Sequence, residues 1–173
     1  AAVVKAASEI GSINALVNNA GVNVFAEPLQ TTDEEWQRCF DINLKGAWHC
    51  CRSVLPQMIA EGGGVILNIG SMSGIVSNIP QNQVAYNTSK AAVHMMTKSI
   101  ASEVAAENIR VNAIAPGYIE TDLSRGGIDN PDWFPTWRSM TPMGRVGQPE
   151  EVAGAALFLC SAAASYVTGE VLV

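Results

Sequence analysis

Short apolar runs separated by long helical patterns constrain the fold of this chain more than any other feature. The runs cover residues 13–18, 65–69 and 109–115, and helical patterns fill about residues 32–60 and 84–106. A strand followed by a helix and another strand pairs in parallel, because the helix carries the chain back across the sheet. With a last strand at residues 169–173, we expect an α/β fold with a doubly wound parallel sheet.

The helix boundaries are marked by local signals. The sequence Thr32-Asp-Glu-Glu35 is a capping box that predicts a helix to about residue 60, and Pro149-Glu-Glu151 opens another to about residue 159. Residues 1–11 have the pattern of a helix tail that ends at Gly11. We expect residues 118–142 to be irregular, with short helical turns at about 133–139.

Composition limits the function classes. The 173 residues are 48% hydrophobic and 15% charged, which suits one globular domain over residues 1–173. The net charge is −6 and the ten basic residues form no run, so nucleic acid is not an expected partner. Apolar stretches all stay well below the roughly 18 residues of a membrane span.

The cysteines predict neither disulfides nor a metal site. No Cys-x-x-Cys pair occurs, and the spacing of His49 and Cys50 fits no zinc pattern. We therefore expect free thiols in a reducing cytoplasm and no metal ion. We interpret His94 as an ordinary helix residue. The four cysteines are Cys39, Cys50, Cys51 and Cys160.

The pair Tyr86 and Lys90 carries the strongest chemical signal. Four residues apart near the start of a helix, the two side chains lie on one face. A phenol has a pKa of about 10, and a nearby ammonium group favours the phenolate. We therefore expect Lys90 to lower the pKa of Tyr86 and to make it a usable acid and base. A serine shortly upstream would complete a site for alcohol–carbonyl redox chemistry.

Four further motifs accompany this pair: Asn18-Asn-Ala-Gly21, Asn43-Leu-Lys-Gly46, Asn68-Ile-Gly-Ser71, and Arg110 to Gly117 followed by Thr121. In this order and spacing, the chain resembles the short-chain dehydrogenases/reductases from end to end. The resemblance implies a Rossmann-type fold and NAD or NADP as cofactor. It also implies that the chain holds only the C-terminal, catalytic part of the fold, because the family's N-terminal glycine-rich motif is not in the sequence.

The resemblance assigns catalytic roles to Asn43, Ser71, Tyr86 and Lys90. Tyr86 is the acid and base, Lys90 also binds the nicotinamide ribose, and Asn43 lies in a locally distorted helix. The family pattern places the serine at the strand end, which favours Ser71. Ser73 matches the family's commonest distance to the tyrosine, so comparing the two alanine variants decides between them.

The implied cofactor contacts follow two strands. Asn18, Ala20 and Gly21 form the turn after the first strand, where small residues let the backbone approach the adenosine side. Asn18 and Asn19 can equally be structural and bond adjacent strands. Pro116, Gly117, Ile119 and Thr121 follow the strand at residues 109–115 and are placed for the nicotinamide carboxamide.

Within the family, the Gly-Ser-Met-Ser-Gly turn and the amide-rich residues 77–83 most resemble polyol dehydrogenases of the galactitol and mannitol type. Residues 122–141 hold three aromatic side chains and are expected to form a mobile lid. The predicted reaction interconverts a sugar alcohol and a ketose. The alternatives are a 3-oxoacyl-carrier-protein reductase, a steroid-type dehydrogenase, and a non-catalytic binding protein.

Two expectations concern the surface. The resemblance places the strand at residues 15–17 next to a strand that the sequence does not contain, so we expect an exposed apolar edge there and hypothesise that the sequence belongs to a longer polypeptide. The two long helices carry more apolar surface than one sheet face covers. Relatives pair these helices between subunits, so we expect a homodimer or homotetramer.

Overall fold

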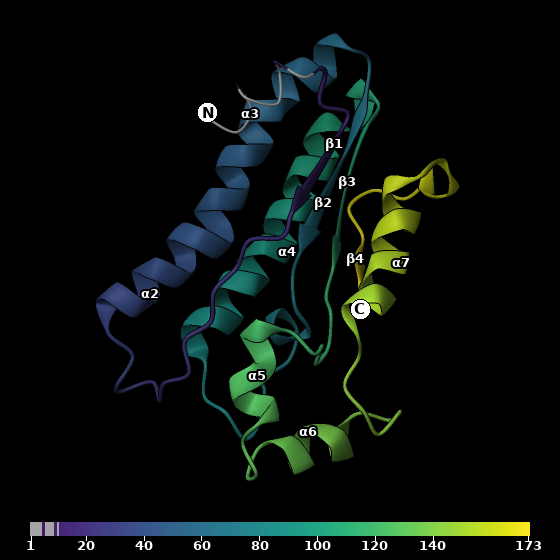
Figure 1. Ribbon diagram of the computed structural model, residues 1–173. Coiled ribbons are helices and arrows are strands. Elements are labelled where there is room, and N and C mark those ends of the chain that lie inside the picture. Colours follow the sequence, from purple (N-terminus) through teal and green to yellow (C-terminus); the bar gives the residue numbers. More distant parts are fainter. Residues whose placement is uncertain (1–4, 6–8, 10) are drawn as a thin grey trace.

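The computed structural model describes residues 5, 9 and 11–173, and its centre is a four-stranded parallel sheet (Figure 1). The strands are β1 (Ala15–Asn18), β2 (Gly64–Ile69), β3 (Ile109–Ile114) and β4 (Val171–Leu172), in that order across the sheet. In register, Leu16 pairs with Ile66, and Ile66 pairs with Val111. The predicted α/β fold with a parallel sheet is therefore confirmed.

Helices cover both faces of this sheet (Figure 1). On one face lie α3 (Ala47–Ala60) and α4 (Val84–Val104), whose buried side chains pack against Ile66 and Val111. On the other lies α7 (Pro149–Cys160), where Leu159 packs against Leu67 and Ile114. The two central strands are buried on both faces, which explains why they are continuous apolar runs rather than alternating ones.

The helix predicted over residues 32–60 forms, but it is not uniform. The capping box at Thr32 is present, and α2 (Asp33–Cys39) continues through a π-helical segment (Phe40–Gly46) into α3. Asn43 is buried inside that π-helical segment. The local distortion expected at Asn43 is therefore observed, and π-helical turns often occur at functional sites.

The segment between β3 and α7 differs in part from the prediction. Helical turns were expected at about residues 133–139, and α6 (Phe134–Met140) confirms them, but α5 (Asp122–Ile128) forms in a stretch that was expected to be irregular. Gly126 and Gly127, poor helix formers, hide the signal for α5. Packing of Gly127 against a neighbouring ring outweighs this low propensity. The predicted helix tail at residues 1–11 lies mostly outside the described residues.

The strand β1 pairs only with β2 among the described strands, and Val17 is 50% exposed. The expected apolar edge is thus present in this structure. None of the helices in residues 11–173 is long and apolar enough to cross a membrane.

Candidate active site

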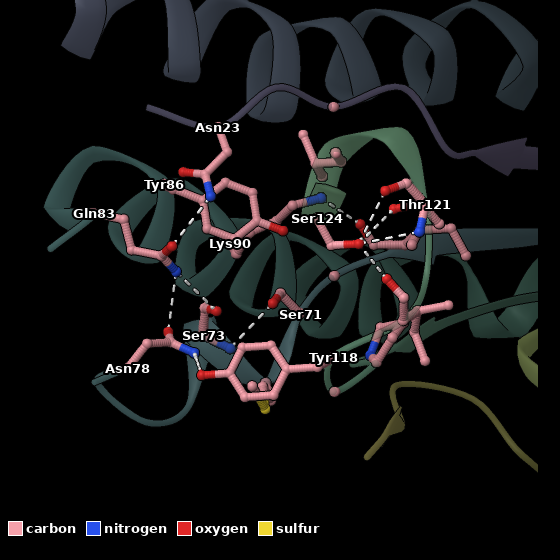
Figure 2. Close-up of a pocket in the computed structure, with 18 of the residues that line it drawn as sticks. Asn23, Ser71, Ser73, Asn78, Gln83, Tyr86, Lys90, Tyr118, Thr121 and Ser124 are labelled. Carbon is pink, nitrogen blue, oxygen red and sulfur yellow. Dashed lines mark hydrogen bonds between the residues drawn. The ribbon is translucent and has the colours of Figure 1, made fainter. Parts of the chain in front are cut away.

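A cavity of about 460 Å³ opens where the parallel strands end (Figure 2). Gly21 lies on the segment that follows β1, Ser71 follows β2, and Gly117 follows β3. Tyr86 and Lys90 reach the same cavity from α4. The carboxyl edge of the sheet is where open α/β folds bind their ligands.

The first turns of α4 hold Tyr86 and Lys90 in fixed positions. Both are buried, at 8% and 4% exposure. Lys90 Nζ donates a hydrogen bond to the carbonyl of Ile69 at 2.7 Å and lies 5.7 Å from the Tyr86 ring centroid. An ammonium group has three protons to donate, so this one bond leaves Lys90 capacity to bind a ligand in the cavity.

The pKa of Tyr86 shifts in the direction opposite to the prediction. Burial raises the pKa of the Tyr86 phenol, while a hydrogen bond with the Ser71 side chain opposes the rise. Lys90 is not among the groups that shift the Tyr86 pKa, and burial lowers the pKa of its own ammonium group to about 8. The prediction that Lys90 lowers the pKa of Tyr86 is therefore wrong for this structure. Sequence spacing predicts that two side chains lie close together, but it does not show how strongly burial desolvates them.

Ser71 and Ser73 lie on one turn but have different surroundings. Ser71 Oγ accepts a hydrogen bond from the main-chain N–H of Ser73, and the Ser71 side chain also bonds to Tyr86. Ser73 Oγ accepts instead from Gln83 Nε2 at 3.2 Å. The serine beside the phenol is Ser71, in agreement with the family pattern at the strand end.

Three of the predicted site residues do not line the cavity: Asn18, Ala20 and Asn43. The Asn18 amide donates to Asn68 Oδ1 at 2.8 Å and so bonds two adjacent strands, which is the structural alternative weighed above. Asn43 bonds to the main chain of Val22. Asn43 therefore supports the loop after β1 without lining the cavity.

The remaining predicted contacts line the cavity: Gly21, Pro116, Gly117, Ile119 and Thr121. A Cβ atom at Gly21 would lie 3.5 Å from Lys90 Nζ, so glycine keeps the approach to that ammonium group open. Thr121 is the N-cap residue of α5, and its N–H donates to Ser124 Oγ at 3.0 Å. The cavity thus offers Lys90, a hydroxyl and small backbone groups, a donor set that fits a nicotinamide and its ribose.

The wall opposite this set is built from amides (Figure 2). Gln83 Nε2 lies within hydrogen-bond distance of Ser73, Asn78 and Asn87, and Gln83 Oε1 accepts from Asn23 Nδ2 at 3.1 Å. Asn23 Oδ1 is buried and accepts no hydrogen bond from any described residue. A ligand hydroxyl would satisfy this acceptor.

An aromatic pair closes one end of the wall. Tyr118 and Trp137 stack with ring centroids 4.0 Å apart and an interplanar angle of 10°. Trp137 Nε1 donates to Gln81 Oε1 at 2.9 Å, so α6 of the expected lid is bonded to the amide-rich loop. Leu123, Ser124 and Trp137 of the expected lid line the cavity in this structure.

Sequence reasoning missed Tyr118, Asn23 and Ser124 as lining residues, and it missed the contact that His94 makes with Ser71. Tyr118 directly follows the Pro116-Gly117 motif, which was a signal for it. Asn23 lies in a loop, and no local pattern indicates where its side chain points. No cluster of potential metal ligands occurs among the residues that the structure describes.

Comparison with known proteins places this geometry in a family. A family model described as enoyl-(acyl carrier protein) reductase matches residues 1–173. The galactitol 2-dehydrogenase of Rhizobium johnstonii is 51% identical over 91% of the chain, and the L-tagatose-forming galactitol 2-dehydrogenase of Cereibacter sphaeroides is 45% identical over 96%. A 3-oxoacyl-[acyl-carrier-protein] reductase of Chlamydia muridarum is 41% identical over 99% of the chain and is covered to 68%.

Solved structures agree with these sequence matches. The crystal structure of gox2181 superposes with a TM-score of 0.96 at 46% identity, over 98% of this chain and 66% of that one. A gluconate 5-dehydrogenase from Burkholderia cenocepacia, in complex with NADP and tartrate, superposes with a TM-score of 0.92 at 37% identity, over 99% and 66%. The chain spans 62% and 65% of the lengths of the two galactitol dehydrogenases. It belongs to the short-chain dehydrogenase/reductase family.

Proposed function

We propose that this protein is an NAD(P)-dependent oxidoreductase that interconverts a secondary alcohol and a ketone, with a sugar alcohol and a ketose as substrate and product. The observation that supports it best is the cavity in which Ser71 and Tyr86 face a wall of amides (Figure 2). Family membership supports the reaction class, and the two galactitol dehydrogenases support the substrate class.

In this proposal Tyr86 exchanges the proton. During oxidation the Tyr86 oxygen takes the proton of the substrate hydroxyl, and during reduction it returns a proton to the carbonyl oxygen. Ser71 holds that same substrate oxygen, because its side chain already lies beside the phenol and bonds to it. Lys90, fixed by Ile69, contributes a positive charge and free hydrogen-bond donors at the base of the cavity.

The residues that would hold the cofactor are Lys90 and Thr121, with the main chain of Gly117 and Ile119. When bound, the nicotinamide supplies the acceptor or donor of the hydride. The gluconate 5-dehydrogenase from Burkholderia cenocepacia binds NADP in its crystal structure, and the family uses NAD or NADP. Gly21 keeps the approach to Lys90 open, as described above.

The polar wall favours a polyol over the alternatives. A substrate with several hydroxyls would satisfy Asn23 Oδ1 and compete for the amide of Gln83, which has two protons for three nearby acceptors. A steroid or a fatty acyl chain would leave Asn23 Oδ1 unpaired, and a buried polar atom without a partner costs about 1–3 kcal/mol. The 3-oxoacyl-carrier-protein reductases are the second candidate, because a relative with that name matches 99% of the chain at 41% identity.

The test is an assay of the full-length protein with NAD and NADP in turn. The readout is the absorbance of the reduced nicotinamide. The panel holds galactitol, mannitol, a β-ketoacyl thioester and a steroid alcohol. We expect turnover with a sugar alcohol and none in a Tyr86→Phe variant. Turnover of the thioester alone would move the assignment to the carrier-protein reductases. Folded protein that binds neither cofactor in calorimetry would support the non-catalytic alternative.

Two further parts of the proposal concern context. Free thiols at all four cysteines suit a reducing cytoplasm. Apolar side chains on the long helices are exposed, among them Trp48 at 40% and Met95 at 62%, and we propose that a second subunit covers them. Light scattering after size-exclusion chromatography gives the number of subunits, and a monomer at micromolar concentration would contradict the oligomer.

A further inference from the structure

His94 contacts the turn that carries Ser71. It lies on α4 one helical turn after Lys90 and is 7% exposed. The main-chain N–H of Ser71 donates a hydrogen bond to His94 Nε2 at 3.3 Å. An imidazole nitrogen accepts a hydrogen bond only when it carries no proton, so in this geometry the ring is neutral and its proton is on Nδ1.

Two glycines fit the ring against this turn. A Cβ atom at Gly70 would lie 2.2 Å from His94 Nε2, and one at Gly74 would lie 2.8 Å from His94 Cε1. The imidazole therefore occupies the space left by glycines at both ends of the turn that holds Ser71 and Ser73. Cβ atoms do not approach other atoms so closely, so a side chain at position 70 or 74 would displace the His94 ring.

We propose that His94 is a positioning residue, whose neutral imidazole holds the Ser71 main chain so that the Ser71 hydroxyl faces Tyr86. The inference rests on the proposed function for its effect on turnover, but the contact itself does not. His94 touches no reacting atom in this scheme. It acts through Ser71, the residue whose side chain bonds to the phenol.

Protonation of His94 would break this contact, because Nε2–H and the Ser71 N–H are both donors. Burial lowers the pKa of the His94 imidazole below its usual 6.5, and the nearby charges of Lys90 and Lys98 lower it further. Both lysines are on α4. The turn at residues 70–74, which receives the ring, has no ionisable side chain. The strand β3, which packs against α4, has one, Arg110, and it donates to the carbonyls of Leu159 and Ser161. Ser71 should therefore lose its support only in acid.

The reduction direction separates His94 from Tyr86. Reduction needs the protonated phenol of Tyr86, and the phenol stays protonated as the pH is lowered. His94 is therefore the group in the scheme that titrates in mild acid. We expect kcat of the wild type to be constant near neutral pH and to fall as the pH drops below 6.5. Reduction should be measured as initial rates between pH 5 and pH 8.

Two variants make the test specific. His94→Gln keeps an acceptor near the position of Nε2 but cannot titrate, so it should retain most of its turnover and lose the decline in acid. His94→Met has similar bulk without a good acceptor, and we expect kcat to fall about 10- to 100-fold with little change in the cofactor KM. A His94→Met variant that folds and keeps the wild-type kcat would overturn the proposal, as would an acid decline that persists in His94→Gln.

A readout without turnover separates this inference from the proposed function. The ¹⁵N-labelled imidazole signal of His94 is assigned as the one that the His94→Gln variant lacks. At neutral pH we expect the His94 signal of the neutral tautomer with the proton on Nδ1. A proton on Nε2, or a charged ring, would overturn the contact even in an active enzyme. If the protein showed the expected tautomer but turned over no substrate of the panel, the contact would be supported and the proposed function would be wrong.

Discussion

The side-chain amide of Asn43 bonds to both main-chain polar groups of Val22. Asn43 Oδ1 accepts from the Val22 N–H at 2.8 Å, and Asn43 Nδ2 donates to the Val22 carbonyl at 3.0 Å and to Ser89 Oγ at 2.9 Å. Asn43 therefore joins the loop after β1 to the π-helical segment and to α4. This loop leads from Gly21 to Asn23 along the cavity.

We predict that Asn43→Asp destabilises the protein. A carboxylate cannot donate to the Val22 carbonyl or to Ser89, and a buried charge would face acceptors, so the free energy of unfolding should fall by about 2–4 kcal/mol. Urea denaturation measures this change. Asp41→Asn is the matched control, because its exposed ion pair with Lys45 contributes little to stability. Equal stability of the two variants would show that the Val22 contact is unimportant.

The two serines are separated by paired substitutions. Ser71→Ala removes the hydroxyl beside Tyr86, and we expect kcat to fall about 100- to 1000-fold. Ser73→Ala removes an acceptor of Gln83 instead, so it should mainly raise the KM for the polyol. Steady-state kinetics of both variants gives the answer. If kcat fell more in Ser73→Ala than in Ser71→Ala, Ser73 would be the catalytic serine, as the family's commonest spacing predicts.

Much of this arrangement followed from local patterns. The Tyr86–Lys90 spacing, the strand ends at Gly21, Ser71 and Gly117, and the capping box at Thr32 needed only periodicity and motif order. These signals are short-range, and the parallel sheet brings their residues together. The family resemblance supplied the assignment of roles.

Other features depend on contacts that no local pattern encodes. Asn18 had two possible roles, and only the pairing of β1 with β2 shows its bond to Asn68. His94 resembles an ordinary helix residue in the sequence because Gly70 and Gly74, which receive its ring, lie about 20 residues away. The pKa of Tyr86 was predicted with the wrong sign, because burial is a property of the whole fold.

The raised pKa of Tyr86 predicts different pH profiles for the two reaction directions. Oxidation needs the phenolate, whose fraction grows with pH up to a pKa above 10.0, so kcat/KM for oxidation should rise between pH 6.5 and pH 8, below the Lys90 pKa of about 8. Reduction needs the phenol and should show no such rise over that range. Initial rates in both directions test this. An oxidation profile that levels off below pH 8 would mean that the pKa in the active complex is lower than burial alone sets.

Lys90 should leave a signature in stability as well as in turnover. Its folded pKa is about 8 and its unfolded value 10.5. Between these values the unfolded chain holds a proton that the folded protein has released, so this group makes stability rise with pH, by at most about 1.4 kcal/mol per pH unit. Lys90→Met should lack that rise and be inactive. The measurement is the difference between the two denaturation curves at pH 8 and pH 10, and a constant difference would contradict the lowered pKa.

Adjacent glycines in α5 provide a final pair of variants. A Cβ atom at Gly127 would lie 1.9 Å from the Trp137 ring, whereas one at Gly126 meets no atom within 4 Å. Gly126→Ala should therefore stabilise the helix by about 0.5–1 kcal/mol, since alanine loses less backbone entropy. Gly127→Ala should displace Trp137 from Tyr118 and Gln81, destabilise the protein by about 1–3 kcal/mol, and raise the KM for the polyol. Thermal unfolding and steady-state kinetics measure both effects. If the two variants behaved alike, Trp137 would not hold the lid over the cavity.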